Sequence, residues 1–282
     1  MPRSFFCIEL HILKQSKDRQ NAMNILFWNI KGNNLQKHIK QCLIENNVDV
    51  AVFAEYKGTD FLLLSKELNY SYHYVETIGG CDKVALLVSK SVNATIKREQ
   101  SRYALYEIET NEKHYIIAGV HLQDRHSTDT AVRIETIGRL MNDIKNLEQS
   151  SKCNNTIVIG DFNANPYDDE LLQMNAFHAV PFKEVIRRSE TRRIDGVSYR
   201  RLYNPVIHFL SEDEQNYGSF YYSQGSKTPV WHCLDQVLLG KSLIDAVYSL
   251  RYIKKIGKIS LLKQVKPDPS ISDHLPLFAQ LK

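Results

Sequence analysis

Polar residues that can bind metals or transfer protons stand at the ends of several apolar runs in this sequence. A residue at the mouth of a strand is held at a fixed distance from its neighbours by the rigid sheet. The set comprises Asn29 after NILFW, Glu55 after VAVFA, His121 after IIAGV, Asp161 and Asn163 after TIVIG, Asp235 before QVLL, and the pair Asp273 and His274 before LPLFAQL. If the strand ends converge, these side chains form one chemical site.

The acids and amides of this set are oxygen donors, and they predict a hard divalent cation. Mg²⁺ prefers one or two carboxylates, completed by water and a substrate phosphate, and an oxygen set without cysteine does not suit zinc. A divalent ion would also offset the repulsion between crowded carboxylates. It would act as a Lewis acid on a phosphoryl oxygen and stabilise an attacking hydroxide or a leaving alkoxide. The expected ion is Mg²⁺, with Mn²⁺ as an alternative.

Two histidines add proton transfer to this chemistry. An imidazole beside a carboxylate is fixed in one tautomer and is poised for general acid or base work near neutral pH. Adjacent residues of a strand point to opposite faces, so Asp273 does not orient His274, and Asp235 is its expected partner. For His121 we expect Asp82, which stands just before the run KVALLVSK.

Each of these residues alone also has an ordinary structural explanation. An Asp or Asn at a strand end is commonly a turn former or a helix cap. A glutamate at the start of a loop is commonly solvated, and a lone histidine is more often structural than catalytic. The functional interpretation therefore depends on the order and local context of the whole set.

Short β-rich runs alternate with helical patterns along the chain. The helical patterns cover 35–46, 59–68 and 128–149, and the last carries Val132, Thr136, Leu140, Ile144 and Leu147 on one stripe. Runs rich in Val, Ile, Tyr and Phe predict strands over 24–30, 49–55, 72–76, 83–89, 103–109, 114–121, 156–160, 234–239, 246–253 and 275–281. Hairpin-like stretches over 83–121 interrupt the alternation, so the α/β chain is expected to build a mixed sheet or a pair of sheets.

Composition limits the class of protein. Of 282 residues, 43% are hydrophobic and 24% charged, which excludes disordered, collagen-like and coiled-coil chains. Lys and Arg total 36 against 32 acids, a net charge of +4 that does not by itself indicate a nucleic-acid partner. Residues 1–22 are expected to be either an N-terminal appendage or an upstream start, and 23–282 a single domain.

Cysteine spacing and hydropathy bear on the expected compartment. The five cysteines include no CxxC pair, which argues against a disulfide framework or a structural zinc site and favours a reducing compartment. No apolar run approaches the roughly 18–20 residues that span a bilayer, and no signal peptide is recognised. We expect a cytoplasmic protein with no membrane partner and no obligate protein partner.

The motifs FWNIKG, VAVFAE, GVHL, VIGDFNANP, LDQVLL and SDHLPLFAQL occur in this order. Together they resemble the endonuclease/exonuclease/phosphatase superfamily, which includes pancreatic-type deoxyribonucleases and abasic-site endonucleases. The resemblance covers about 23–282, and GDFN combined with the downstream SDH carries most of it. It implies two packed mixed β-sheets flanked by helices, a four-layer sandwich, with the site at one edge.

The resemblance also implies roles for the site residues. Asn29 matches the first-strand Asn and Glu55 the metal-binding Glu, and Asp273 matches a metal-linked Asp. Asp161 matches the acid that orients or deprotonates water, and Asn163 helps to hold the phosphate. The metal set implied is Glu55, Asn29, Asp273 and Asp161.

The remaining matches concern the histidines and the substrate. Asp235 matches the acid that orients His274, which contacts the scissile phosphate. His121 is similar to the second phosphate-side histidine of the deoxyribonuclease branch, and Asp82 stands where that branch pairs a Glu with it. The substrate-binding candidates are Asn29, Asn163, Arg125, and Lys57 at a position where deoxyribonucleases place an Arg that enters the minor groove.

Two basic stretches favour a nucleic-acid substrate, DNA more than RNA. Residues 181–201, expected to rim the site, and residues 246–267 concentrate Lys and Arg, which suits contacts to backbone phosphates, although a solvated face gives the same pattern. Aromatic residues between 199 and 231 would stack on bases if exposed, but they more often serve packing.

The expected activity is divalent-metal-dependent phosphodiester hydrolysis by in-line attack of an activated water, in a nuclease acting on DNA. One alternative is a phosphatase or phosphodiesterase of the same superfamily with a lipid or small phosphoester substrate, although WHCLDQ only partly matches the phosphoinositide branch. The other is a non-catalytic binding relative.

Overall fold

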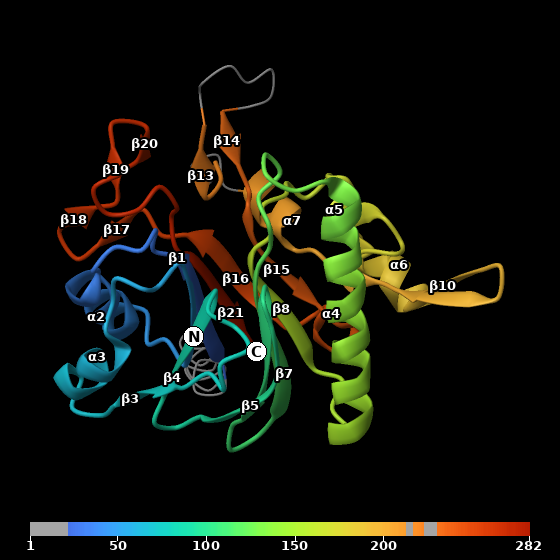
Figure 1. The fold of residues 1–282 in the computed structure, drawn as a ribbon, viewed down its shortest axis with the longest axis horizontal. Coiled ribbons are helices and arrows are strands. Elements are labelled where there is room, and N and C mark those ends of the chain that lie inside the picture. Colours follow the sequence, from blue (N-terminus) through green and yellow to red (C-terminus); the bar gives the residue numbers. More distant parts are fainter. Residues whose placement is uncertain (1–21, 213–216, 223–229) are drawn as a thin grey trace, which may run out of the picture.

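Two mixed β-sheets pack face to face and carry helices on their outer faces (Figure 1). The computed structural model describes residues 22–212, 217–222 and 230–282. The expected N-terminal appendage therefore lies, apart from residue 22, outside the described residues. Within the described part, no helix combines the length and the apolarity needed to cross a bilayer.

The first sheet has six strands and the second has seven. In spatial order the first comprises β16 (Val247–Tyr252), β21 (Leu277–Leu281), β1 (Met23–Asn29), β2 (Val50–Ala54), β4 (Val84–Ser89) and β3 (Tyr72–Val75). The second comprises β5 (Asn93–Gln100), β6 (Tyr103–Glu109), β7 (His114–His121), β8 (Thr156–Asp161), β15 (Asp235–Leu239), β12 (Leu202–Tyr203) and β9 (Ala179–Val180). Both sheets are mixed, because β1–β2 and β7–β8 are parallel pairs while most other pairs are antiparallel.

Four short hairpins and several helices complete the described chain. The hairpins are β10 (Thr191–Ile194) with β11 (Val197–Arg200), β13 (Phe220–Tyr221) with β14 (Trp231–His232), β17 (Lys255–Ile256) with β18 (Ile259–Ser260), and β19 (Leu262–Lys263) with β20 (Lys266–Pro267). The helices are α2 (Gln36–Glu45), α3 (Phe61–Glu67), α4 (Thr130–Ser151), α5 (Asp169–Leu172), α6 (Lys183–Arg188), α7 (Val206–Glu212) and the 3₁₀ turn η1 (Lys241–Leu243).

The four layers explain why the central strands are apolar on both faces. Every residue of β2, β8 and β15 is buried, because one face of each strand meets the other sheet and the opposite face meets helices or loops. The α2 and α3 helices lie outside the six-stranded sheet, and α4 covers the seven-stranded one (Figure 1). The two sheets approach closely at Gly119, where an added Cβ would stand 3.0 Å from Val52 Cγ1.

The long α4 helix differs in one respect from its predicted stripe. Thr136, Leu140 and Ile144 are buried as expected, but Val132 is 46% exposed and the neighbouring Arg133 is fully buried. Arg133 forms an ion pair with Glu170 of α5, which is also fully buried, with Nη1 and Oε1 2.7 Å apart. A buried charge is tolerated when it is paired with an opposite charge, and this ion pair joins the start of α4 to α5.

Candidate active site

The register of the strands brings the predicted site residues to one edge of the sandwich. Asn29 is level with Ala54 in the parallel β1–β2 pair, so it lies beside Glu55. Asp161 at the end of β8 is level with His121 of β7 on one side and with Asp235 of β15 on the other. Gly160 permits the close packing of β7 and β8 there, because an added Cβ would stand 2.0 Å from the Val120 carbonyl oxygen.

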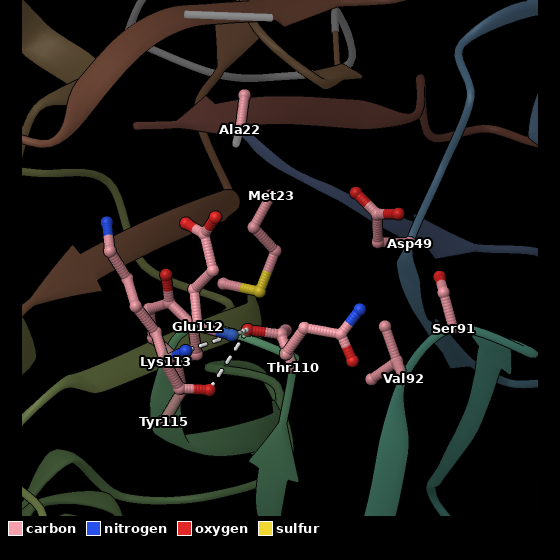
Figure 2. A pocket seen from close by; sticks show the side chains of 10 residues that line it. Ala22, Met23, Asp49, Ser91, Val92, Thr110, Glu112, Lys113 and Tyr115 are labelled. Carbon is pink, nitrogen blue, oxygen red and sulfur yellow. Dashed lines mark hydrogen bonds between the residues drawn. The ribbon is translucent and has the colours of Figure 1, made fainter. Parts of the chain in front are cut away.

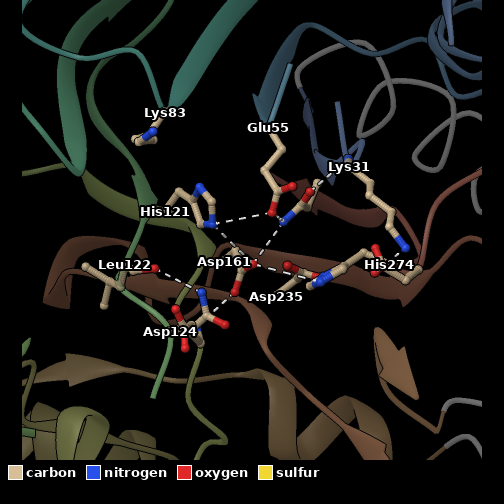
Figure 3. Close-up of polar contacts among 12 residues, drawn as sticks. Lys31, Glu55, Lys83, His121, Leu122, Asp124, Asp161, Asp235 and His274 are labelled. Carbon is tan, nitrogen blue, oxygen red and sulfur yellow. Dashed lines mark hydrogen bonds and ion pairs between the residues drawn. The ribbon is translucent and has the colours of Figure 1, made fainter. Parts of the chain in front are cut away.

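Asn29 connects the two sheets at this edge. Its buried side-chain amide donates through Nδ2 to Glu55 Oε1 at 3.0 Å and to Asp161 Oδ2 at 3.1 Å. Figure 3 labels these two acceptors, together with His121 and His274. The Oδ1 of Asn29 accepts from the backbone N–H of Lys31 at 3.0 Å. The expected role as a direct metal ligand is therefore not what this geometry shows: the amide oxygen is occupied by the backbone, and the amide nitrogen positions two carboxylates.

Asp161 is the centre of the cluster. It is almost fully buried, and its Oδ1 accepts from the backbone N–H of Asn163 at 2.8 Å. Its Oδ2 faces His121 Nε2 at 3.9 Å and His274 Nε2 at 4.0 Å, in addition to Asn29. The carboxylate thus has one oxygen fixed by the backbone and the other directed at both imidazoles.

The loop after Asp161 is fixed by hydrogen bonds from helix α4. Asn163 adopts a left-handed backbone conformation with φ of 47°, and its Nδ2 donates to the Leu122 carbonyl at 2.9 Å. Arg133 Nη2 donates to the carbonyls of Phe162 and Asn163 at 3.0 and 2.9 Å. The buried Arg133 therefore fixes the turn that places the Asn163 N–H on Asp161.

His274 is oriented by the partner expected from the sequence. Its Nδ1 lies 2.8 Å from Oδ2 of Asp235, which is fully buried in β15. Its backbone is fixed by Trp28, whose Nε1 donates to the His274 carbonyl at 3.0 Å, and by Ser272, whose Oγ accepts the His274 N–H at 3.1 Å. The ring of Phe220 packs against the imidazole with centroids 4.9 Å apart.

The charge on His274 follows from these neighbours. Burial disfavours the protonated imidazole, but the carboxylates of Asp235, Asp161 and Asp273 outweigh burial and raise the pKa of His274 to about 10. Its Nδ1–H is committed to Asp235, so Nε2–H is the donor that faces the cluster. At neutral pH this is a cationic hydrogen-bond donor suited to a phosphate oxygen.

His121 occupies the other side of Asp161, but Asp82 is not its partner. The Nε2 of His121 lies 3.7 Å from Glu55 Oε1, and its buried Nδ1 has no hydrogen-bond partner among the described residues. Asp82 is instead an exposed residue paired with Lys57 at 2.9 Å and with Lys83 at 3.4 Å. The prediction of an Asp82–His121 pair is wrong, because the short carboxylate is held by two surface lysines in front of β4.

The other predicted substrate-binding cations have partners as well. Lys57 is committed to the Asp82 ion pair, which also lowers the pKa of Asp82. Arg125 pairs through Nη1 with Asp168 at 2.7 Å and through Nη2 with Glu170 at 3.3 Å. These contacts tie Arg125 to α5 and its preceding loop, and the substrate-binding roles of Lys57 and Arg125 stay predictions.

Among the acids of the site, Glu55 is the one best placed to bind a hard cation. The Glu55 side chain is 44% exposed, and its carboxylate shares the Asn29 amide with Asp161. Two carboxylates with space for water and a phosphate are what Mg²⁺ prefers. Asp273, by contrast, pairs with Lys31 at 2.9 Å, so its assignment as a metal-linked acid stays a prediction.

A second grouping in the described chain also brings metal-binding atoms together. One ligand atom each of Asp161, Asp235 and His274 lie within 4.8 Å of one another. In this group, however, His274 already donates to Asp235, and a protonated imidazole repels a cation. This group of three therefore suits a divalent cation less well than the exposed carboxylate of Glu55 does.

The first basic stretch does not rim the site. Residues 181–201 form α6 and the β10–β11 hairpin, which projects to one side of the molecule (Figure 1). Arg200 lies beside Gly240 and Asn154, at the ends of β15 and β8 opposite Asp235 and Asp161. The expectation is wrong for a topological reason: the segment connects β9 to β12 at the far edge of the sheet. Residues 246–267 do reach the site end, where β20 contacts β13.

Several residues of the site carried little or no signal in the sequence. Ser272 donates to the Asn29 carbonyl at 2.7 Å, and Ser219 accepts the Asp235 N–H at 3.1 Å. Ser272 could have been found from its place beside Asp273 and His274. Ser219 and Phe220 lie just before and at the start of the two-residue strand β13, which is too short to show a periodicity, and only the fold shows that they belong to the site.

A cavity lies at the opposite end of β1 from Asn29. It measures about 190 Å³ and is lined by residues that include Met23, Asp49, Thr110 and Lys113 (Figure 2). The polar bonds there include the Lys113 N–H donating to Thr110 Oγ1 at 3.0 Å and the Asn24 N–H donating to Asp49 Oδ2 at 2.8 Å. It contains no group of three metal-ligating side chains among the described residues, so we place the chemistry at the open edge instead.

Comparisons with known proteins show the family and the fold of this chain. Residues 24–274 match the model of the Endonuclease/Exonuclease/phosphatase family. Truncated TDP2 from Caenorhabditis elegans is similar in structure, with a TM-score of 0.58 at 15% identity, over 93% of this chain and 98% of that one. The endonuclease domain of TRAS1, a telomere-specific non-LTR retrotransposon, gives a TM-score of 0.54 at 11% identity, over 92% and 98%.

A phosphatase has a comparable structure. The mannosyl-6-phosphatase Bt3783 of Bacteroides thetaiotaomicron gives a TM-score of 0.57 at 12% identity, over 92% of this chain and 99% of that one. No curated protein matches the sequence. At these identities the likeness shows the shared fold, which has the two-sheet architecture expected from the sequence.

Proposed function

The chain belongs to the endonuclease/exonuclease/phosphatase family, and on that premise we propose that it is a divalent-metal-dependent phosphodiester hydrolase acting on DNA. One observation carries the proposal: Asp161 Oδ2 faces two imidazoles and shares an amide donor with the exposed Glu55. That arrangement would bring together a base (Asp161), a cationic hydrogen-bond donor (His274) and an exposed carboxylate able to bind a metal ion (Glu55).

In the proposed reaction, a water oxygen attacks phosphorus opposite the leaving oxygen. The new P–O bond forms as the bond to the leaving oxygen breaks, and the water proton passes to the Asp161 carboxylate. The leaving oxygen departs with the electron pair of the broken bond and takes up a proton from solvent. His274 Nε2–H offsets the charge that builds on a non-bridging oxygen, while Asp235 holds the ring in place. His121 Nε2 faces the same space from the Glu55 side.

Glu55, with Asp161 beside it, would hold the ion. When bound, a divalent cation supplies Lewis-acid polarisation of the phosphoryl oxygen. Asn163 supports the site from the adjacent turn: one amide hydrogen is used on the Leu122 carbonyl, and the second is available to a phosphate oxygen.

The basic residues on the site side support a polyanionic substrate. Lys263 and Lys266 are exposed on the β19–β20 hairpin, and β20 contacts β13 beside His274. Cations placed along the path of a strand contribute affinity through counterion release. The neighbouring structures include both TDP2 and a sugar phosphatase, so the assay must compare DNA with a small phosphomonoester.

The test uses the purified full chain with supercoiled plasmid, with Mg²⁺, Mn²⁺ or a chelator. We expect nicking or degradation that requires the metal, stops with chelator and is absent from the Asp161→Asn variant. Mannose 6-phosphate and a phosphoinositide serve as competing substrates. Metal-dependent hydrolysis of either one, with plasmid and single strands left intact, would replace the nuclease proposal with a phosphatase.

A further inference from the structure

The β13–β14 hairpin stands directly beside His274 and is attached to the site through both of its strands. On β13, Phe220 forms a β-bridge with His274, and the Leu275 N–H donates to the Ser219 carbonyl at 2.8 Å. On β14, His232 Nδ1 lies 3.0 Å from Asn165 Nδ2, in the loop that follows Asp161. The base of the hairpin therefore has a fixed position relative to His274 and to the loop that follows Asp161.

The residues next to these anchors are aromatic. Tyr221 is paired with Trp231 across the hairpin, and their rings meet edge to face at 5.3 Å and 81°. Tyr217 lies on Trp231 at 5.8 Å with the planes 34° apart. We call Tyr217, Tyr221, Tyr222 and Trp231 the aromatic cluster. Tyr217 and Tyr222 are 52% and 40% exposed, which is more than packing against a core requires.

A positive charge accompanies the exposed rings. Lys254 Nζ stands 4.8 Å from the centre of the Tyr217 ring, within the range of a cation–π contact. The β19–β20 hairpin, with exposed Lys263 and Lys266, adjoins β13. Exposed aromatic faces beside cations are the combination that binds unpaired nucleotides, because bases stack on the rings while phosphates meet the charges.

We propose that the aromatic cluster is a stacking subsite for an unpaired base next to the scissile phosphate, so that single strands and locally unpaired regions, such as those in a negatively supercoiled plasmid, are favoured over a fully paired duplex. This rests on the proposed function, and it adds the form of DNA that the site accepts. Bases inside a duplex are already stacked on each other and present only their edges in the grooves. A ring face reaches a base only where the strand is unpaired.

The chain contains two tryptophans, and this makes the subsite directly observable. Trp28 is fully buried, whereas Trp231 is part of the cluster and partly exposed. The experiment titrates the inactive Asp161→Asn full-length chain with a ten-nucleotide oligo(dT) and follows tryptophan emission. We expect saturable quenching by oligo(dT), and little quenching by an abasic strand of equal length or by a blunt duplex.

Variants separate stacking from other causes of a signal. Trp231→Ala should weaken binding of labelled oligo(dT) by roughly 5- to 100-fold, the usual range for one base–aromatic contact. Trp231→Phe keeps a ring, so it should retain affinity within about threefold and lose the quenching. Tyr248→Ala is the matched control, since Tyr248 is also 52% exposed but lies on β16 level with the end of β21 away from His274.

Failure of this proposal can be told apart from failure of the proposed function. Metal-dependent hydrolysis of bis(4-nitrophenyl) phosphate and of plasmid by the wild-type chain tests the reaction. If those activities are present but Trp231→Ala binds oligo(dT) like wild type, or if blunt duplex binds better than the single strand, the stacking subsite is refuted. If neither substrate is hydrolysed while oligo(dT) still quenches Trp231, the subsite stands and the hydrolase proposal falls.

Discussion

Acidic residues lie at both ends of the β8–β15 pair, but their partners differ between the two ends. At the far end, Glu148 is bound by Arg200 Nη1 at 2.5 Å and accepts a bond from Thr156, and Arg200 Nε also reaches Glu190 at 3.2 Å. At the site end, Asp161 and Glu55 share the Asn29 amide as a donor, and the His121 imidazole faces both of them.

The difference shows how one scaffold separates stability from chemistry. Acids at the far end are neutralised by arginine in a half-buried setting, so they fasten α4 to the sheet. Acids at the site end face donors that leave them able to accept a proton or a cation. We therefore expect substitutions at the site end to reduce activity, and substitutions at the far end to reduce the free energy of unfolding.

The largest expected effect comes from Asp161→Asn. The amide keeps the shape of the side chain but accepts no proton, so plasmid hydrolysis should fall by about 10²–10⁴-fold. The free energy of unfolding in urea should stay within about 1 kcal/mol of wild type. A variant that is cleanly folded and fully active would remove Asp161 from the reaction and break the comparison.

The next effect concerns the ion. Glu55→Gln removes the exposed carboxylate, and the Mg²⁺ concentration that gives half-maximal activity should rise roughly 10–100-fold. Asp82→Asn provides the control, because Asp82 is an exposed acid held by Lys57 and Lys83, and it should leave the Mg²⁺ dependence unchanged. Equal shifts in both variants would point to a general loss of negative charge rather than to a metal position.

Substitutions at the far end of β8 and β15 should lower the free energy of unfolding without changing the activity. Arg200→Met leaves Glu148 without its cation, and because both side chains are partly exposed the cost should be about 1–3 kcal/mol in urea unfolding. Specific activity at saturating Mg²⁺ should be unchanged. The double variant with Glu148→Met should recover part of the loss. A drop in activity without a drop in stability would contradict the division between the two ends.

The smallest expected effect distinguishes the two basic stretches. Lys263→Gln with Lys266→Gln should lower DNA affinity and flatten its salt dependence by up to about 2 in the log–log slope, if each lysine meets one phosphate. Arg192→Gln with Arg193→Gln, on the projecting β10–β11 hairpin, should change neither. Binding to a labelled oligonucleotide at several salt concentrations measures both pairs, and the opposite ranking would place the DNA on the hairpin side.

Much of the sandwich could be predicted because its central strands are apolar and continuous. The runs around Asn29, Glu55 and Asp161 gave strand positions within one or two residues, and the His274–Asp235 contact followed from the alternation of strand faces. The edge strand β5 was missed because its exposed residues, NATIKREQ, carry no apolar period. An edge strand is specified by its neighbour more than by its own sequence.

The sequence could not show which charged side chains are paired with other residues of the chain. Arg133 reads as a polar residue beside an apolar stripe, yet it is fully buried with Glu170, a partner 37 positions away by sequence number. The arginines of 181–201 read as a phosphate-binding surface, yet Arg187 and Arg200 are committed to acids of the same chain. Ion pairs between residues far apart in the sequence decide whether a charged side chain is available to bind a ligand. These pairs cannot be deduced from the composition of a single sequence.

The amide of Asn29 has a mechanical consequence. It belongs to the six-stranded sheet, as does the strand that ends before Glu55, whereas Asp161 belongs to the seven-stranded sheet. The proposed site therefore spans the plane where the two sheets meet, so the rate of turnover should depend on how the two sheets are aligned. A wedge at that plane, such as Gly119→Ala against Val52, should slow the reaction well before the chain loses its fold.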